Sequence, residues 1–218
     1  MKVRSGVPTL ATVPSSAEWL PARPVKFQGS GLARAALRLA GWRVVFDGLP
    51  ARQGVLIVYP HTSNWDFPLG VLTKWTLGIP VSFWGKDSLF KVPVFGAWVR
   101  WLGGIPVDRF SARGVVGDMA ARFRAARQAD EFLWLALAPE GTRKYQDHWR
   151  SGFYAMTVQA EVPLGLVAFD YATREVRVNS FLKLSGDAAA DMAVIAGHFS
   201  QVRGLRHEQA APIRIRQG

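Results

Sequence analysis

The sequence contains no cysteine. This absence excludes disulfide bonds, thiol nucleophiles and cysteine-held metal centres, and it fits a reducing compartment. The motifs of several other enzyme classes are also missing, namely the G-x-S-x-G elbow, the Walker A loop, the G-x-G-x-x-G turn and the H-E-x-x-H zinc motif. The sequence therefore favours chemistry without a covalent Ser or Cys intermediate, and it implies no metal or redox cofactor.

Long hydrophobic runs are missing too. Nowhere do about 18 uncharged apolar residues follow one another, so no membrane-spanning helix is expected. The first thirty residues contain Pro, Ser and Gly but lack the apolar core of a signal peptide. We expect residues 1–30 to be a flexible or extended segment and residues 31–218 to form one domain. A cytoplasmic location is expected, which is compatible with peripheral attachment to a membrane.

Acidic residues are few, with 16 Asp and Glu against 27 Lys and Arg, and the net charge is +11. Such a surface attracts anions, whether nucleic acid, anionic lipid headgroups or phosphorylated substrates. An arginine-rich composition can equally reflect genome bias. The net charge therefore indicates several classes of anionic partner and does not distinguish between them.

Hydrophobic periodicity predicts strands that alternate with helices. Strands are expected at 42–48, 54–60, 81–84, 104–109, 131–139, 162–170 and 174–184, and helices at 31–40, 67–78, 88–104, 112–129, 150–160 and 187–203. The run at 54–60 suits a buried parallel strand, whereas 174–184 alternates like an antiparallel edge strand. In the first helix, Leu32, Ala36 and Leu39 share one face. This order predicts a single α/β domain with a mostly parallel central sheet flanked by helices.

Three polar residues fall at the ends of predicted strands. His61 follows 54–60, Arg109 ends 104–109, and Glu140 follows 131–139. In parallel sheets, functional groups gather at the carboxyl ends of the strands. We therefore expect these three residues to share a site.

His61 and Asp66 form a candidate base and its partner. A histidine can accept a proton near neutral pH, and a carboxylate on its second nitrogen fixes the tautomer. On a regular helix the two residues would lie about 140° apart, so they can meet only if the segment turns. Pro60 and Asn64 favour such a turn. The alternative interpretation is that His61 packs passively and Asp66 caps the helix that follows.

Four blocks in order resemble the 1-acylglycerol-3-phosphate acyltransferases, also called lysophospholipid acyltransferases. The family pattern N-H-x-S-x-x-D, Gly-apolar-apolar-apolar-(Asp)-Arg, E-G-T-R and a short apolar block with Pro is matched between about residues 54 and 168. In this chain the blocks are His61-Thr-Ser63-Asn-Trp-Asp66, Gly104-Ile-Pro-Val-Asp108-Arg109, Glu140-Gly141-Thr142-Arg143 and Val162-Pro163-Leu164. Pro60 replaces the usual Asn, Leu166 replaces a second Pro, and no hydrophobic helical hairpin precedes the first block.

The resemblance implies a glycerol-3-phosphate acyltransferase-like fold and a role for each motif residue. His61 would be the general base and Asp66 its orienting partner. Arg109 and Arg143 would bind an acceptor phosphate, because a guanidinium matches a phosphate bidentately. Glu140 and Gly141 would shape the acceptor pocket, and Ser63 and Thr142 complete the candidate substrate-binding set.

The reaction that the resemblance implies is transfer of a fatty acyl group from acyl-CoA or acyl-carrier protein to a hydroxyl of a lysophospholipid-like, phosphorylated glycerolipid. No cofactor beyond the donor thioester is implied. Another polar lipid, such as a lyso-aminolipid, is the alternative acceptor. A basic module that binds anionic lipid or nucleic acid is the alternative from another class, and the complete set of motif residues argues against it.

Aromatic residues are concentrated between residues 75 and 101, and two interpretations of them stay open. They are Trp75, Phe83, Trp84, Phe90, Phe95, Trp98 and Trp101. They can form ordinary core, or they can form an acyl-chain tunnel or a membrane-facing surface. Tryptophan beside Lys74, Lys91 and Arg100 is typical of a protein–membrane interface. On that second interpretation the protein lies at the inner face of the membrane.

Substitution of Arg109 tests whether the acceptor carries a phosphate group. A phosphate–guanidinium contact contributes roughly 1.5–3 kcal/mol, so Arg109→Ala should lower kcat/KM for the acceptor by about 10- to 150-fold. The KM for the donor should hardly change, and Arg109→Lys should retain part of the activity because it keeps the charge without the fork. Steady-state kinetics with each substrate varied in turn measures both. Equal use of phosphate-free acceptors by the wild type would contradict the phosphorylated acceptor.

Overall fold

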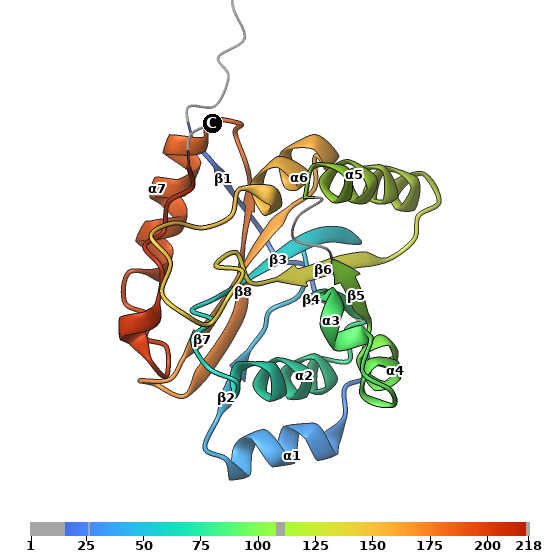
Figure 1. Cartoon of the computed structure of the whole chain (residues 1–218), viewed down its shortest axis with the longest axis vertical. Helices are drawn as coiled ribbons and strands as arrows, with labels where there is room; N and C mark the ends of the chain where they lie inside the picture. The colour runs from blue at the N-terminus through green and yellow to red at the C-terminus, as the bar shows by residue number, and fades with distance from the viewer. Residues whose placement is uncertain (1–15, 26, 108–111, 217–218) are drawn as a thin grey trace, which may run out of the picture.

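The computed structural model describes residues 16–25, 27–107 and 112–216, and it is built on one sheet between two layers of helices (Figure 1). The strands are β1 (Glu18–Leu20), β2 (Arg43–Val45), β3 (Gln53–Tyr59), β4 (Val81–Lys86), β5 (Gly104–Val107), β6 (Leu133–Leu137), β7 (Leu164–Asp170) and β8 (Glu175–Lys183). The helices are α1 (Gly31–Leu39), α2 (Asp66–Leu77), α3 (Asp87–Phe90), α4 (Phe95–Trp101), α5 (Ala112–Gln128), α6 (Gly152–Ala160), α7 (Ala188–Phe199) and the short 3-10 helix η1 (His207–Gln209).

The sheet has the strand order β1-β8-β7-β3-β6-β4-β5, and β2 pairs with β8. Its centre is parallel: β3 pairs with both β6 and β7, and β4 pairs with both β5 and β6, each time in parallel. Only the pairings of β8 with β7 and with β1 are antiparallel among the described strands. The predicted α/β domain with a mostly parallel sheet is confirmed.

Strand β3 lies in the middle of this sheet and is covered on both faces. Its side chains alternate between two hydrophobic cores, with Val55 and Ile57 in one and Leu56 in the other. Helices α5, α6 and α7 contribute to the first core, and α1 and α2 contribute to the second (Figure 1). A strand buried on both faces needs an uninterrupted apolar sequence, which explains the run at 54–60.

Strand β8 corrects one expectation. It is antiparallel to β7, as its alternating sequence indicates, but it does not lie at the edge of the sheet. Its other side pairs with β1 near Lys183 and with β2 near Glu175. Each of these partner strands has three residues, too few to show a period. The first of them comes from the part of segment 1–30 that the structure describes, and Arg23 forms a further bridge to Leu49.

The aromatic stretch 88–104 is also not one helix. It forms two short helices, α3 and α4, separated at Pro93 and Val94. Proline lacks the N–H that a continuing helix requires, and Val94 adopts a φ of 60°, outside the helical region. Helical spacing of the aromatic residues therefore did not reveal the break between them.

Helix α1 has apolar residues on two faces. Ala33 and Leu37 are buried against the protein, whereas Leu32 and Leu39 are 85% and 90% exposed. The face that Leu32, Ala36 and Leu39 share by sequence spacing is therefore directed to solvent. Among the described helices, none is both long and apolar enough to cross a bilayer.

Candidate active site

His61 lies at the carboxyl end of the central strand β3, immediately after the cis peptide Tyr59–Pro60. Its Nδ1 lies 3.3 Å from Oδ2 of Asp66. The Asp66 side chain is buried, while the imidazole retains 20% of its exposure. The two motif residues therefore meet, and the histidine ring stays accessible to a ligand.

A tight turn between β3 and α2 brings the pair together. Asp66 is the first residue of α2, and its Oδ2 accepts hydrogen bonds from the backbone N–H groups of Thr62 and Ser63, each at 2.8 Å. The Ser63 hydroxyl accepts a hydrogen bond from Trp65 N–H and closes the turn. Because the carboxylate bonds to residues that precede the helix, Asp66 is not its N-cap.

Tyr171 is a site residue that the sequence analysis missed. Its hydroxyl donates to Oδ1 of Asp66 at 2.7 Å, although the two residues are 105 positions apart. Burial, and then the Asp66 charge, raise the pKa of Tyr171 well above its ordinary value. The phenol is therefore a proton donor to the carboxylate throughout the physiological range. Tyr171 follows β7 directly, and no motif marks it.

Glu140 supports the backbone of the histidine. It is buried, Oε2 accepts the His61 backbone N–H at 2.6 Å, and Oε1 accepts the Ala211 N–H at 3.0 Å. Burial raises the pKa of Glu140, and the two backbone hydrogen bonds oppose that shift. Both carboxylate oxygens are thus engaged with backbone. The contacts found here connect the exit of β3 to the C-terminal part of the chain.

The other residues of the E-G-T-R block are more exposed to solvent than Glu140. Gly141 has a φ of 69°, a backbone conformation that favours glycine, and an added Cβ would come within 2.4 Å of the Arg150 side chain, which would have to move. The Thr142 hydroxyl accepts a hydrogen bond from Lys144 N–H at 3.3 Å. Arg143 is exposed. Arg109 lies outside the described residues, and β5, which precedes it, is separated from β3 by β6 and β4.

A segment near the C-terminus crosses over the turn that carries His61. We call residues 203–211 the C-terminal strap. Arg206 N–H donates to the Thr62 hydroxyl, and the strap's Arg203 carbonyl accepts from Tyr171 N–H. At Gly204 a Cβ would lie 2.7 Å from the Thr62 hydroxyl, so the strap can approach this closely only with glycine there. The sequence carries no recognisable signal for this contact.

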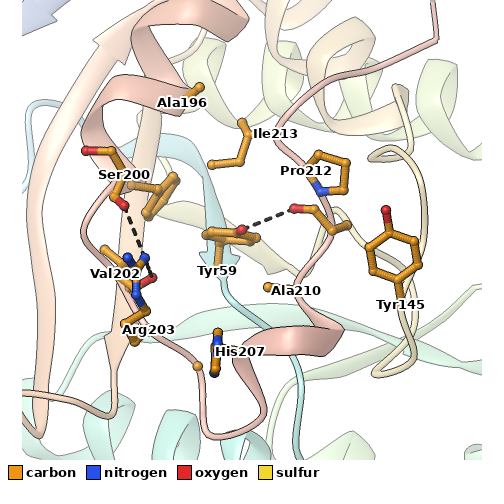
Figure 2. Close-up of a pocket in the computed structure, with 13 residues that line it drawn as sticks. Tyr59, Tyr145, Ala196, Ser200, Val202, Arg203, His207, Ala210, Pro212 and Ile213 are labelled. Carbon is orange, nitrogen blue, oxygen red and sulfur yellow. Dashed lines mark hydrogen bonds between the residues drawn. The ribbon is translucent and has the colours of Figure 1, made fainter.

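The strap also borders a cavity of about 460 Å³, which is open to solvent (Figure 2). Its lining includes Tyr59 and Tyr145, Phe199 of α7, and Arg203 and His207 of the strap. The Tyr59 hydroxyl donates to the Ala211 carbonyl at 3.1 Å, as the dashed line in Figure 2 shows. Burial, followed by the charge of Glu140, raises the pKa of Tyr59 to about 12, against the opposing effect of Arg203. The cavity thus adjoins the β3 exit on the side of α7.

Within residues 16–25, 27–107 and 112–216, no group of three His, Asp or Glu side chains could hold a metal ion. The ionisable groups at the β3 exit include the imidazole of His61, the carboxylates of Asp66 and Glu140, and the phenol of Tyr171. This set suits proton transfer.

The sequence from residue 43 to residue 169 matches the Acyltransferase family. The chain belongs to that family. The match spans more than half of the chain, from the start of β2 into β7, and includes the turn that carries His61 and Asp66. The resemblance seen in the sequence motifs is confirmed, and the protein is an acyltransferase. Tyr171 and the C-terminal strap lie beyond the matched residues.

Among solved structures, this acyltransferase is similar to the crystal structure of the 1-acyl-sn-glycerophosphate (LPA) acyltransferase PlsC from Thermotoga maritima. The two share 18% sequence identity, and the alignment covers 78% of this chain and 73% of that chain with a TM-score of 0.47. No curated protein sequence matches the chain.

The contacts of Glu140 lead to a prediction about stability. Glu140→Gln replaces one acceptor oxygen by an NH₂ group, which must then face a backbone N–H donor. An unsatisfied buried donor costs roughly 1–3 kcal/mol, so the melting temperature should fall by several degrees. Glu161→Gln is the matched control, because that side chain is 82% exposed and lies 3.9 Å from Arg127. Thermal unfolding of both variants checks this, and an unchanged melting temperature for Glu140→Gln would show that its two hydrogen bonds are dispensable.

Proposed function

We propose that this acyltransferase moves a fatty acyl group from acyl-CoA or acyl-carrier protein to a hydroxyl of a lysophospholipid-like, phosphorylated glycerolipid. The observation that carries the proposal is the 3.3 Å approach of His61 Nδ1 to the buried Asp66 carboxylate, at the carboxyl end of the central strand. Asp66 also holds the turn in place, so its position does not depend on the histidine alone.

The pair sets the role of each imidazole nitrogen. With the Nδ1 proton directed at Asp66, the Nε2 lone pair is available as the base. As the acceptor hydroxyl attacks the thioester carbonyl, its proton passes to Nε2 and a tetrahedral intermediate forms. When the intermediate collapses, the C–S bond breaks and the thiolate takes the proton from Nε2. The products are an ester and a free thiol, so atoms and charges balance without an acyl-enzyme.

The phosphorylated acceptor is supported by the order of the motifs and by the charge of the chain. Arg143 is exposed and lies three residues after Glu140, and Arg109 occupies the arginine position of the second block. The net charge of +11 favours an anionic substrate. A lyso-aminolipid is the second candidate acceptor, since the same base and partner would serve its hydroxyl equally well.

Peripheral attachment at the inner face of the membrane is part of the proposal. Val94, at the break between α3 and α4, is 85% exposed, and Trp101, the last residue of α4, is 72% exposed. Trp101 packs edge-on against Trp75 of α2 with ring centroids 6.3 Å apart, so apolar surface of α4 continues onto α2. Phe90, by contrast, is buried core. The aromatic stretch thus divides into core and surface residues, and the surface part suits the interface of a bilayer.

The function is tested first at the histidine. His61→Ala should lower turnover by at least about 10²-fold, the low end of general-base contributions, and Asp66→Asn should also be damaging with the fold intact. Turnover is followed by mass spectrometry of the lipids formed from labelled acyl-CoA and a mixed lysolipid pool, which also identifies the acceptor. A folded His61→Ala enzyme with near-wild-type turnover would remove His61 as the base.

Membrane attachment is tested by flotation with liposomes that contain anionic lipid. Binding should be strong at low ionic strength and weaker at high ionic strength, because a basic protein is attracted electrostatically to such a surface. Replacing the exposed Trp98 and Trp101 by Ser should weaken binding further. Trp19→Ser is the matched control, since Trp19 is also exposed but packs beside His198. If the wild type does not bind these liposomes even at low salt, the exposed aromatic residues do not attach the protein to a membrane.

A further inference from the structure

We propose that Tyr171 is a positioning residue for the reaction, holding the Asp66 carboxylate in the orientation that directs His61. This inference rests on the proposed function, because it gives Tyr171 a role only if His61 and Asp66 act as base and partner. The geometry that carries it is a three-residue chain in which Tyr171 Oη lies 2.7 Å from Asp66 Oδ1 and Asp66 Oδ2 lies 3.3 Å from His61 Nδ1.

The two carboxylate oxygens of Asp66 have different partners. Oδ2 accepts from Thr62 N–H and Ser63 N–H and faces His61. Oδ1 accepts from Tyr171, a residue on a different part of the fold. The contacts of Oδ2 therefore fix the carboxylate within its own turn, whereas the contact of Oδ1 fixes it relative to the sheet. Without the phenol, the carboxylate keeps its local bonds but loses this second anchor against rotation.

Tyr171 is itself held from several sides. It follows the last residue of β7, and its ring packs edge-on against Trp42 with centroids 4.9 Å apart. Its N–H donates to the carbonyl of Arg203 in the C-terminal strap at 2.8 Å. A side chain held by the sheet, an aromatic neighbour and the strap can orient a carboxylate with little freedom of its own.

The electrostatic surroundings support a donor role for the phenol. Burial and the Asp66 charge raise the pKa of Tyr171, so its hydroxyl keeps the proton that it donates. Glu140 lies in the loop after β6, where burial raises its pKa most; the charge of His61 lowers that pKa and the charge of Asp66 raises it. Arg203 affects a different residue: burial raises the pKa of Tyr59, and the charge of Arg203 lowers it. Because the Glu140 carboxylate lies near His61 and Asp66, the negative charge of Asp66 depends more on the hydrogen bond that Tyr171 donates to it.

Tyr171→Phe isolates the hydroxyl because the ring and its contact with Trp42 remain. We expect kcat to fall by about tenfold, the low end for losing a hydrogen bond to a charged group, with little change in the acceptor KM. Loss of a donor makes the ionised Asp66 less favourable and favours protonation of the coupled pair. The acidic limb of the pH–rate profile should therefore move to higher pH.

The chain offers a matched control. Tyr154 donates to Oδ2 of buried Asp191 at 2.7 Å, the same kind of bond at the same distance. Tyr154→Phe should lower the melting temperature as Tyr171→Phe does, but it should leave kcat and the pH–rate profile of the wild type unchanged. A purely structural role for Tyr171 would make the two variants behave alike.

A double-mutant comparison separates this inference from the proposed function. If Tyr171 acts through Asp66, Tyr171→Phe should have a much smaller effect on kcat in the Asp66→Asn background than in the wild type. Full additivity, or an unmoved pH–rate profile in a folded Tyr171→Phe enzyme, overturns the positioning role while leaving the base intact. Near-wild-type turnover of His61→Ala would instead overturn the proposed function itself. Melting temperatures of all variants show whether each remains folded.

Discussion

The site depends on the contacts that the buried carboxylate of Asp66 makes. A charge removed from water is tolerated only when its oxygens are paired and hydrogen-bonded. Two backbone N–H groups, the imidazole of His61 and the phenol of Tyr171 supply those partners here. Because three of them, the two N–H groups and the imidazole, belong to the turn between β3 and α2, satisfying the carboxylate also shapes that turn. The same contacts that stabilise the charge place the histidine.

The sheet supplies the second constraint. Parallel pairing in register, with Ile57 opposite Leu137, brings the carboxyl ends of β3 and β6 to one edge. Glu140 can therefore reach the His61 backbone from the neighbouring strand. Its second oxygen binds Ala211, so the C-terminal strap closes over the same edge. Hydrogen bonds to Glu140 thus join three segments that are far apart in sequence.

On the side of α1, α2 and α4, the surface of the protein carries exposed apolar side chains. Helix α1 uses Ala33 and Leu37 for packing, and leaves Leu32 and Leu39 exposed. Exposed tryptophans of α4 and the edge-on pair of Trp75 and Trp101 extend the apolar surface. Apolar residues exposed on neighbouring elements of a basic protein are consistent with the proposed attachment to an anionic membrane. The turn that carries His61 leads directly into α2, so the candidate site and this surface share one helix.

Local sequence determined the central architecture and the turn that brings His61 and Asp66 together. The apolar run of β3, the alternation of strands and helices, and the spacing of His61 and Asp66 each express constraints that act within a few residues, and the structure has them where the sequence places them. Tertiary structure alone decided that β8 is flanked by β1 and β2, that the outer face of α1 stays exposed, and that Tyr171 meets Asp66. Those features depend on distant segments whose contacts leave no periodic or spaced signal: three-residue strands are too short to alternate, and a phenol 105 positions from its carboxylate follows no local rule.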